Sequence, residues 1–270
     1  MMPSSDSSHQ RLARWARRLI GDARWEQQPR TRKVNVGRVV WQTSTMEALL
    51  AGIYDSDVTI RQVLRHGDFG LGTFDGLDGE LIILDGFCYR IRSDGGAEPA
   101  DDRDHSPFAV VTTFTPDITF DITEPLSLTA VRTLVDEAVP STNLVTAVRL
   151  HGTFTTMTTR TVAKQHEPYP GLAAAAAAAP KHTEEQVEGT VVGFRTPDFE
   201  EGLSVAGYHL HFIDSARAHG GHVFDFTLAR GTVALSISSE VHLSFPRSGA
   251  FLSTELVHPE EADDIRNAEG

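Results

Sequence analysis

The pattern of hydrophobic and polar positions predicts a chain made of many short strands and a few helices. Alternating, β-branched and aromatic residues predict strands within 108–120, 145–161, 187–194 and 231–245. Between 67 and 96, apolar runs alternate with Asp-Gly turns, which is typical of a meander of short strands. We expect the strand segment 145–161 to be interrupted by a turn at His151 and Gly152.

Three other segments have apolar residues at the spacing of an amphipathic helix. The longest of them is 126–139, where apolar residues recur along one face. The other two follow capping-box signatures, which are Ser44 with Glu47 and Thr59 with Gln62. Helices kept apart from many strands indicate an α+β (mixed α/β) fold. We expect two domains, each built on a mixed or antiparallel β-sheet with a few helices.

Shifts in composition suggest where the chain divides. Residues 1–38 hold nine Lys or Arg and three acidic residues, so we interpret 1–35 as a basic, partly disordered N-terminal extension. Seven alanines after Leu172 show no apolar pattern that would dock a helix, and we interpret 171–183 as an Ala/Pro linker. The sequence thus predicts an N-terminal α/β domain at 36–170 and a C-terminal β domain at 184–270.

The overall composition excludes several classes of protein. A formal net charge of -13 over 270 residues argues against a nucleic-acid partner, because phosphate binding needs clustered Lys and Arg. The single cysteine, Cys88, rules out an internal disulfide and any thiolate metal cluster. No apolar run has the length of a membrane span and no secretion signal is apparent, so we expect a cytoplasmic protein without a membrane partner.

The densest group of potential metal ligands lies in a predicted hairpin of the C-terminal half. His209 and His211 are separated by one residue on a predicted strand, so their imidazoles point to the same face. His222 follows a Gly-Gly pair, where the returning strand should begin, and can lie across from them. Three neutral imidazoles suit a borderline divalent ion, Zn²⁺ first, and leave a fourth coordination position open.

Spacing alone leaves other interpretations of these side chains open. Closely spaced histidines also occur by chance as packed or solvated residues, and His219 could replace His222 as the third ligand. Arg160 lies among small and apolar residues of a predicted strand, where it either binds an anion or is an exposed strand arginine. Glu80 follows an Asp-Gly turn at the mouth of an apolar strand, where a solvated carboxylate is the commoner outcome.

Longer motifs extend beyond these single residues. They run in order from about Val36 to the C-terminus and are QTSTMEALLAGIYDSDVTI, LRHGDFGLGTFDGLDGELIILDG, HGTFTTMTTRTV, KQHEPYPGL, GTVVGFRTPDF and GYHLHFI...GGHVFDF. In sequence and spacing they closely resemble the α-acetolactate decarboxylases. The basic leader and the alanine run depart from the pattern of that family.

The resemblance implies roles for individual residues. The zinc ligands of the family fall on His209, His211 and His222, and its active-site arginine falls on Arg160. Its pocket threonine falls on Thr73, so we expect Thr73 and Arg160 to bind substrate.

The resemblance also implies two catalytic glutamates. Glu80 matches one of them, and the second comes from a C-terminal tail that returns to the active site. Glu269 is the best match in this tail, with Glu255 as a weaker candidate. Arg160, Glu80 and Glu269 are therefore the expected catalytic residues.

The activity that the resemblance implies is the metal-dependent decarboxylation of 2-acetolactate to (R)-acetoin and CO₂, through a zinc-stabilised enediolate. It also implies Zn²⁺ as the cofactor and a homodimer. We expect Arg160 to orient the leaving carboxylate and Glu80 or Glu269 to protonate the enediolate carbon. The alternatives are a different metal-assisted reaction on a related 2-hydroxy-3-keto acid, and a catalytically silent metal-binding or ligand-sensing protein on the same scaffold.

Overall fold

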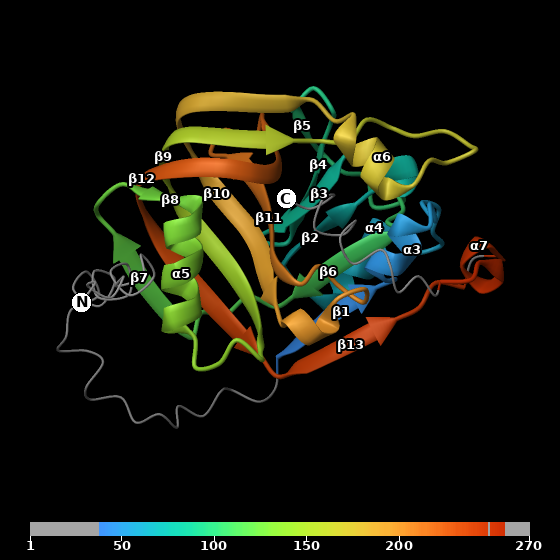
Figure 1. Ribbon diagram of the computed structural model, residues 1–270, viewed down its shortest axis with the longest axis horizontal. Helices are drawn as coiled ribbons and strands as arrows, with labels where there is room; N and C mark the ends of the chain where they lie inside the picture. The colour runs from blue at the N-terminus through green and yellow to red at the C-terminus, as the bar shows by residue number, and fades with distance from the viewer. Residues whose placement is uncertain (1–37, 248, 257–270) are drawn as a thin grey trace, which may run out of the picture.

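The polypeptide folds into two β-sheets that pack against each other, with short helices at their margins (Figure 1). The computed structural model describes residues 38–247 and 249–256. The predicted N-terminal extension at 1–35 and the predicted catalytic residue Glu269 lie outside the described residues. No helix in the described ranges is long and apolar enough to span a bilayer.

The first sheet has seven strands in the order β13-β1-β6-β2-β3-β4-β5. Its neighbouring strands are antiparallel except for β1 and β13, which are parallel. The strands β2, β3 and β4 follow one another along the chain and confirm the predicted meander. The bounds are β1 Val39–Thr43, β2 Phe69–Thr73, β3 Glu80–Leu84, β4 Phe87–Ile91, β5 Ala97–Pro99, β6 Phe108–Thr112 and β13 Glu240–Ser244.

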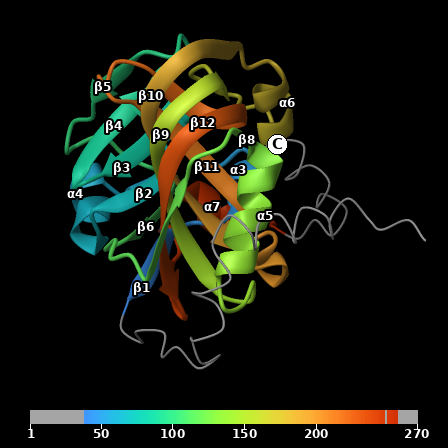
Figure 2. The same ribbon diagram turned by 90° about the vertical axis from the view of Figure 1, so that its left-hand side faces the viewer.

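The second sheet is built on three long, curved strands, β9, β10 and β12 (Figures 1 and 2). Its order is β11-β10-β9-β12-β7, and β8 pairs with β12. Because β11 also pairs with β12, the strands β9 to β12 close into a ring. The bounds are β7 Ile118–Ile122, β8 Leu126–Ser127, β9 Val145–Arg160, β10 Lys181–Thr196, β11 Gly207–Asp214 and β12 Gly220–Ser238.

The helices are short apart from α5, which lies along the second sheet (Figure 1). α5 confirms the helix predicted at 126–139, and its apolar face packs into the core of that sheet. The α-helices are α3 Met46–Leu50, α4 Ile60–Val63, α5 Leu128–Ala138, α6 Leu172–Ala177 and α7 Gly249–Ser253. The 3₁₀ turns are η1 Leu64–His66, η2 Asp75–Leu77 and η3 Asp198–Glu200.

One of the two predicted helix caps is confirmed and the other is wrong by one residue. Thr59 and Gln62 form the reciprocal hydrogen bonds of a capping box at α4. At α3 the side chain of Thr45, and not that of Ser44, accepts the hydrogen bond from Ala48 N. Ser44 has a φ of 64° and its N–H bonds to Ser244 O, so the chain still turns at this residue.

The turn predicted at His151 and Gly152 is wrong, because β9 runs through both residues without a break. A Cβ atom at Gly152 would lie 2.3 Å from Arg230 O and 2.8 Å from Gly231 Cα of the neighbouring strand β12. This glycine therefore permits a close approach of two backbones, which is the other common reason for a glycine in a strand.

The alanine run forms helix α6 instead of a loose linker. Leu172, Ala175 and Ala176 are buried in a core cluster to which both sheets contribute. Just before the helix, the Tyr54 hydroxyl donates a 2.7 Å hydrogen bond to Pro170 O. The surfaces that bury α6 come from segments far away in sequence, so no local apolar pattern could reveal its docking.

Few helices and two large sheets confirm the α+β fold class. The expected boundary near residue 170 does not separate the two sheets. Strands β7, β8 and β9 precede it and belong to the second sheet, whereas β13 follows it and belongs to the first. The division into two domains stays a prediction.

Candidate metal centre and active site

The predicted histidine hairpin is confirmed by β11 and β12. In the antiparallel register His211 lies directly opposite His222, and His209 lies two residues before His211 on the same face. All three side chains are buried, and their ligand nitrogens lie within 4.8 Å of one another. His219 is in the loop between the strands with its side chain 60% exposed, so the structure groups His222 and not His219 with the other two.

Two of the three imidazoles, those of His209 and His211, are held in the neutral form by their surroundings. His211 Nδ1 lies 3.0 Å from Leu81 O, and because a carbonyl can only accept, Nδ1 carries the proton and leaves the lone pair on Nε2. That Nε2 is 3.2 Å from His209 Nε2. Burial, and next the charge of Arg160, lowers the pKa of His209 to about 3. Burial and the neighbouring His209 also hold the pKa of His211 well below its usual value.

These features fit a bound divalent cation. Neutral imidazole is the form that binds metal, and burial keeps the rings of His209 and His211 neutral at physiological pH. The hydrogen bond to Leu81 O fixes the tautomer of His211 from behind, as is common for metal-bound histidines. The described residues thus contain a buried group of three histidines that could hold a metal ion.

Arg160 lies beside this group. It is the last residue of β9 and stands opposite His222 in the register of β9 and β12, so the two side chains share a face. With 7% of its surface exposed, Arg160 is not the exposed strand arginine that one interpretation expected. No carboxylate in the described part of the chain forms an ion pair with its guanidinium, which leaves it able to bind an anion.

Glu80 and Thr73 face the histidine group and Arg160 from the first sheet. They are register partners on β3 and β2, and Thr73 is also opposite Phe108 of β6, so all three side chains share a face. Glu80 Oε2 is 3.4 Å from His211 Nε2, and the Glu80 side chain is only 14% exposed, which contradicts a solvated turn carboxylate. The Thr73 hydroxyl donates a 2.9 Å hydrogen bond to Gly79 O in the turn that precedes Glu80.

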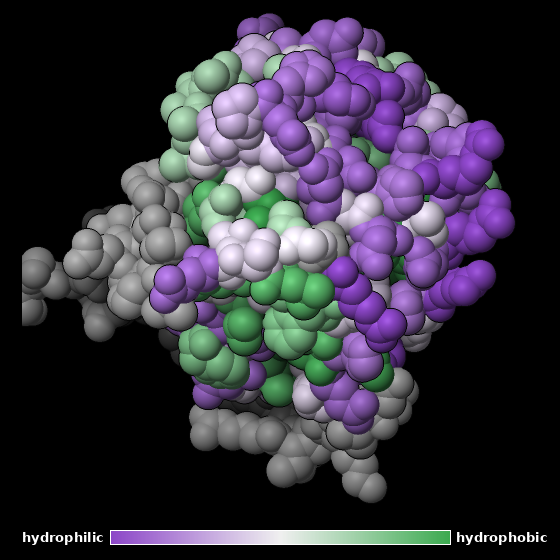
Figure 3. Space-filling model, turned by 90° about the vertical axis from the view of Figure 1, so that its right-hand side faces the viewer, coloured by the Kyte–Doolittle hydropathy of each residue, from purple (hydrophilic) through white to green (hydrophobic). Residues whose placement is uncertain are grey.

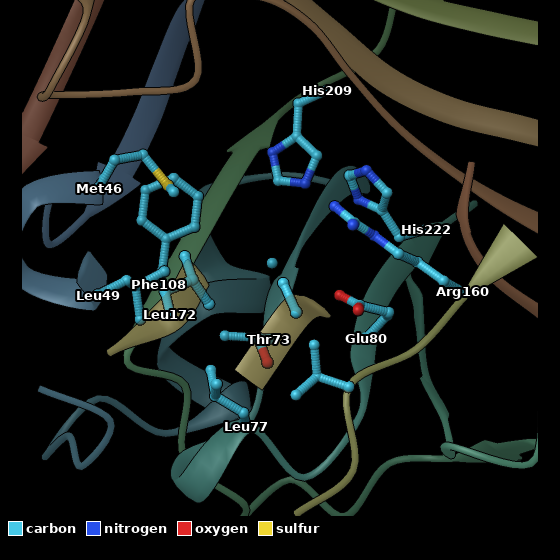
Figure 4. A pocket seen from close by; sticks show the side chains of 13 residues that line it. Met46, Leu49, Thr73, Leu77, Glu80, Phe108, Arg160, Leu172, His209 and His222 are labelled. Carbon is cyan, nitrogen blue, oxygen red and sulfur yellow. The ribbon is translucent and has the colours of Figure 1, made fainter. Parts of the chain in front are cut away.

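The two groups of side chains line one pocket with a polar and an apolar side (Figure 4). His209, His222, Arg160 and Glu80 gather on the polar side. The apolar side chains that line the pocket are Met46, Leu49, Leu77, Phe108, Val162, Leu172 and Ala176. The arrangement can hold a cation and an anionic ligand together while apolar groups of that ligand face away from water.

Reasoning from the sequence missed the apolar side of the pocket. Met46 and Leu49 belong to α3, and Leu172 and Ala176 belong to α6, none of which carries a chemical signal of its own. The long motifs that contain Met46, Leu49 and Leu172 were the available hint. Glu255 is exposed and does not line the pocket, so the structure does not place this weaker glutamate candidate at the site.

Comparison with known proteins gives a consistent result. The family model described as "Alpha-acetolactate decarboxylase" matches residues 40–258. The chain is 43% identical over 230 residues to the alpha-acetolactate decarboxylase of Methylococcus capsulatus, covering 85% of this chain and 88% of that protein. It is also 43% identical over 231 residues to that of Bacillus subtilis, covering 86% and 91%.

Solved structures agree with the sequence comparisons. An X-ray crystal structure of alpha-acetolactate decarboxylase from Bacillus subtilis strain 168 is similar with a TM-score of 0.84 and 43% identity, covering 86% of this chain and 99% of that one. A Staphylococcus aureus protein, described as of unknown function and similar to alpha-acetolactate decarboxylase, has a TM-score of 0.83 at 33% identity. It covers 86% of this chain and all of its own.

Proposed function

The chain belongs to the alpha-acetolactate decarboxylase family and is a carboxy-lyase of 2-acetolactate, and from this premise we propose how its buried pocket carries out the reaction. The observation that carries the proposal is the convergence of three buried histidines, Arg160 and Glu80 from opposite sheets. The polar side of the pocket binds the carboxylate, carbonyl and hydroxyl groups of the substrate. The apolar side takes its alkyl groups.

The proposed cofactor is Zn²⁺, held by His209, His211 and His222. Three neutral nitrogen donors with an open fourth position are typical of a catalytic zinc site. When bound, the ion would supply Lewis-acid chemistry, because it accepts negative charge that develops on the substrate carbonyl oxygen.

Arg160 binds and orients the substrate carboxylate in this proposal. A guanidinium can hold a carboxylate through two parallel hydrogen bonds, and a buried position strengthens the interaction. This contact holds the carboxylate in the orientation in which its bond to C2 breaks. The carboxylate leaves as CO₂, and the electron pair of the broken bond stays on C2 and delocalises onto the neighbouring carbonyl oxygen as an enediolate.

Glu80 delivers the proton that completes the reaction. Its carboxyl group lies beside the histidine group and must be protonated when it donates to C2, after which water restores the proton. Because the donor reaches the planar enediolate from one sheet only, the proton is added to one face, which gives (R)-acetoin. Glu269 lies outside the described residues, and its role as the second catalytic glutamate stays a proposal that rests on the resemblance.

The test is acetoin formation from racemic 2-acetolactate by the purified protein, followed by chiral analysis. We expect (R)-acetoin to form, to disappear after chelation and to return with Zn²⁺. His222→Ala should lower kcat/KM by roughly a hundredfold or more and reduce the zinc content. His219→Ala is the matched control, since this histidine lies only three residues before His222 but is exposed, and the variant should keep both kcat/KM and zinc content.

Two outcomes would contradict the proposal. Stoichiometric zinc without acetoin would mean that the metal site is present but the substrate differs, which would favour a related 2-hydroxy-3-keto acid or a silent binding protein. Full activity after complete removal of metal would overturn the metal-dependent mechanism.

The homodimer and the cytoplasmic location also stay proposals. Large apolar side chains are exposed on η3, on the loop after it and around α7, namely Phe199, Leu203, Phe245 and Leu252. Figure 3 shows apolar side chains gathered on the side of the molecule where α3, α6 and α7 lie. Such a surface supports association with a second copy. Light scattering of the purified protein should give twice the mass of the chain.

A further inference from the structure

Ala176 has the smallest side chain on the apolar side of the pocket. Met46, Leu49, Leu77, Phe108, Val162 and Leu172, the other apolar residues that line the pocket, all carry larger side chains. Ala176 is 4% exposed and lies on α6, four residues after Leu172, so the two side chains project from the same face of the helix. A larger side chain at Ala176 would therefore take room from the pocket.

The helix that carries Ala176 is held from several sides. Its N-terminus follows Pro170, whose carbonyl accepts the Tyr54 hydroxyl at 2.7 Å, and the ring of Tyr54 packs against that of Tyr169 at 5.0 Å. α6 also contacts α3, which contributes Met46 and Leu49 to the same wall. A wall made of two packed helices is a fixed boundary, because side chains in a close-packed core have little room to move.

The chemistry of the proposed function determines what this wall meets. The carboxylate, carbonyl and hydroxyl groups of a 2-hydroxy-3-oxo acid are bound on the polar side. Its remaining parts are the alkyl groups on C2 and on the carbonyl carbon, and these must face the apolar wall. The size of these alkyl groups is thus the feature that the wall can discriminate.

We infer that Ala176 is a specificity-determining residue, whose small side chain sets the length of the substrate alkyl groups that the pocket accepts. The inference rests on the proposed function and goes beyond it to the range of substrates. One methylene in an apolar pocket typically changes kcat/KM by roughly 10-fold to 200-fold, so the effect is large enough to measure. The alanine run is in this view part of the active site and not a spacer.

The experiment compares 2-acetolactate with two homologues that are each one methylene longer, at the C2 alkyl group or at the acyl group. We expect Ala176→Val and Ala176→Leu to lower kcat/KM for at least one homologue about tenfold more than for 2-acetolactate. Leu172→Ala should raise the ratio of kcat/KM for the homologue to kcat/KM for 2-acetolactate, because it makes more room beside the same wall. This variant keeps the test decisive if Ala176→Leu does not fold.

Two neighbouring alanines provide matched controls. Ala174 is on the same helix but exposed, and Ala174→Leu should leave the ratio of the substrates unchanged. Ala175 is buried in the core but does not line the pocket, so Ala175→Val should lower stability and affect all three substrates equally.

The outcomes separate this inference from the proposed function. If the wild type forms acetoin but neither the Ala176 variants nor Leu172→Ala change the substrate ratio, the inference is overturned and the function stands. An equal change of the ratio in Ala175→Val would also overturn it, because it would reflect a general disturbance of α6. If the wild type forms no acetoin from 2-acetolactate, the function fails and the inference falls with it.

Discussion

Single side chains at the site have properties that depend on neighbours from distant parts of the chain. Glu80 opens β3, whereas its contact His211 lies in the second sheet, 3.4 Å away. The ring of His211 is in turn oriented by Leu81 O, from the residue next to Glu80. One short segment of β3 therefore fixes both an imidazole of the histidine group that could hold a metal ion and a carboxyl group beside it, so a shift of β3 would disturb both together.

For a single residue at the site, we predict that Glu80→Gln lowers kcat. The amide keeps the shape of the side chain but cannot deliver a proton, so kcat should fall roughly 100-fold to 10,000-fold while zinc content and fold remain. Steady-state kinetics with metal analysis on the same preparation measure this. Glu269→Gln should be compared in parallel, because the larger loss of kcat identifies the proton donor. Near-normal kcat in Glu80→Gln would refute the role given to Glu80.

Among the elements, the long strand β9 connects the fold to the site. It pairs with β10 on one side and β12 on the other, and it ends at Arg160. The position of this guanidinium therefore depends on the register of β9 over its whole length. Near the middle of the strand, at Gly152, the backbone of β12 lies so close that an added Cβ would collide with it.

We predict that Gly152→Ala destabilises the protein. The added Cβ would meet Arg230 O at 2.3 Å, and since this contact is with backbone, the strands must separate or shift. The free energy of unfolding should fall by about 1–3 kcal/mol, as for other overpacked positions. Urea denaturation followed by circular dichroism measures it. Gly249→Ala is the control, because nothing lies within 4 Å of its added Cβ, and it should be neutral.

For the molecule as a whole, we expect stability to depend on pH through a half-buried carboxyl group that does not line the pocket. Asp75, in the η2 turn between β2 and β3, is half-buried, and its Oδ1 has no hydrogen-bond partner among the described residues. Burial, and next the charge of Asp55, raises its pKa from 3.8 to about 7, whereas Lys164 opposes the shift. Asp104 and His105, the latter 3.8 Å from Asp75, also face this carboxyl group.

The raised pKa of Asp75 makes the protein less stable as the pH rises. The folded protein keeps a proton that the unfolded chain releases above a pKa of about 4, so the stability from this group is full below that pH and is lost as pH rises through about 7. Asp75→Asn should remove this loss. Because the side chain is about a third exposed, we expect a gain of only about 1 kcal/mol over the wild type at pH 8, and none at pH 4.

Urea unfolding of both proteins across this pH range measures the difference. Asp101→Asn is a control, since Arg103 lowers the pKa of Asp101 to about 2 and the variant should show no gain at pH 8. A constant difference between Asp75→Asn and the wild type at all pH values would contradict the assigned cause.

The sequence by itself determined those features that depend on residue type and short-range spacing. Alternation on a strand placed His209 and His211 on one face, and the glycine pair placed His222 on the returning strand. Local patterns likewise predicted α5, the capping box at Thr59 and the meander, because each depends on interactions within about a turn or a hairpin. The motifs indicated the family.

The tertiary structure alone decided which distant segments meet. No local signal could show that Glu80 and Thr73 of one sheet face the histidines and Arg160 of the other, because burial and contact depend on how the sheets pack. For the same reason Gly152 resembled a turn residue, and the alanines of α6 resembled a linker. Alanine has almost no pattern of its own, so only the surfaces of α3 and the core, brought together by folding, could make α6 a wall of the pocket.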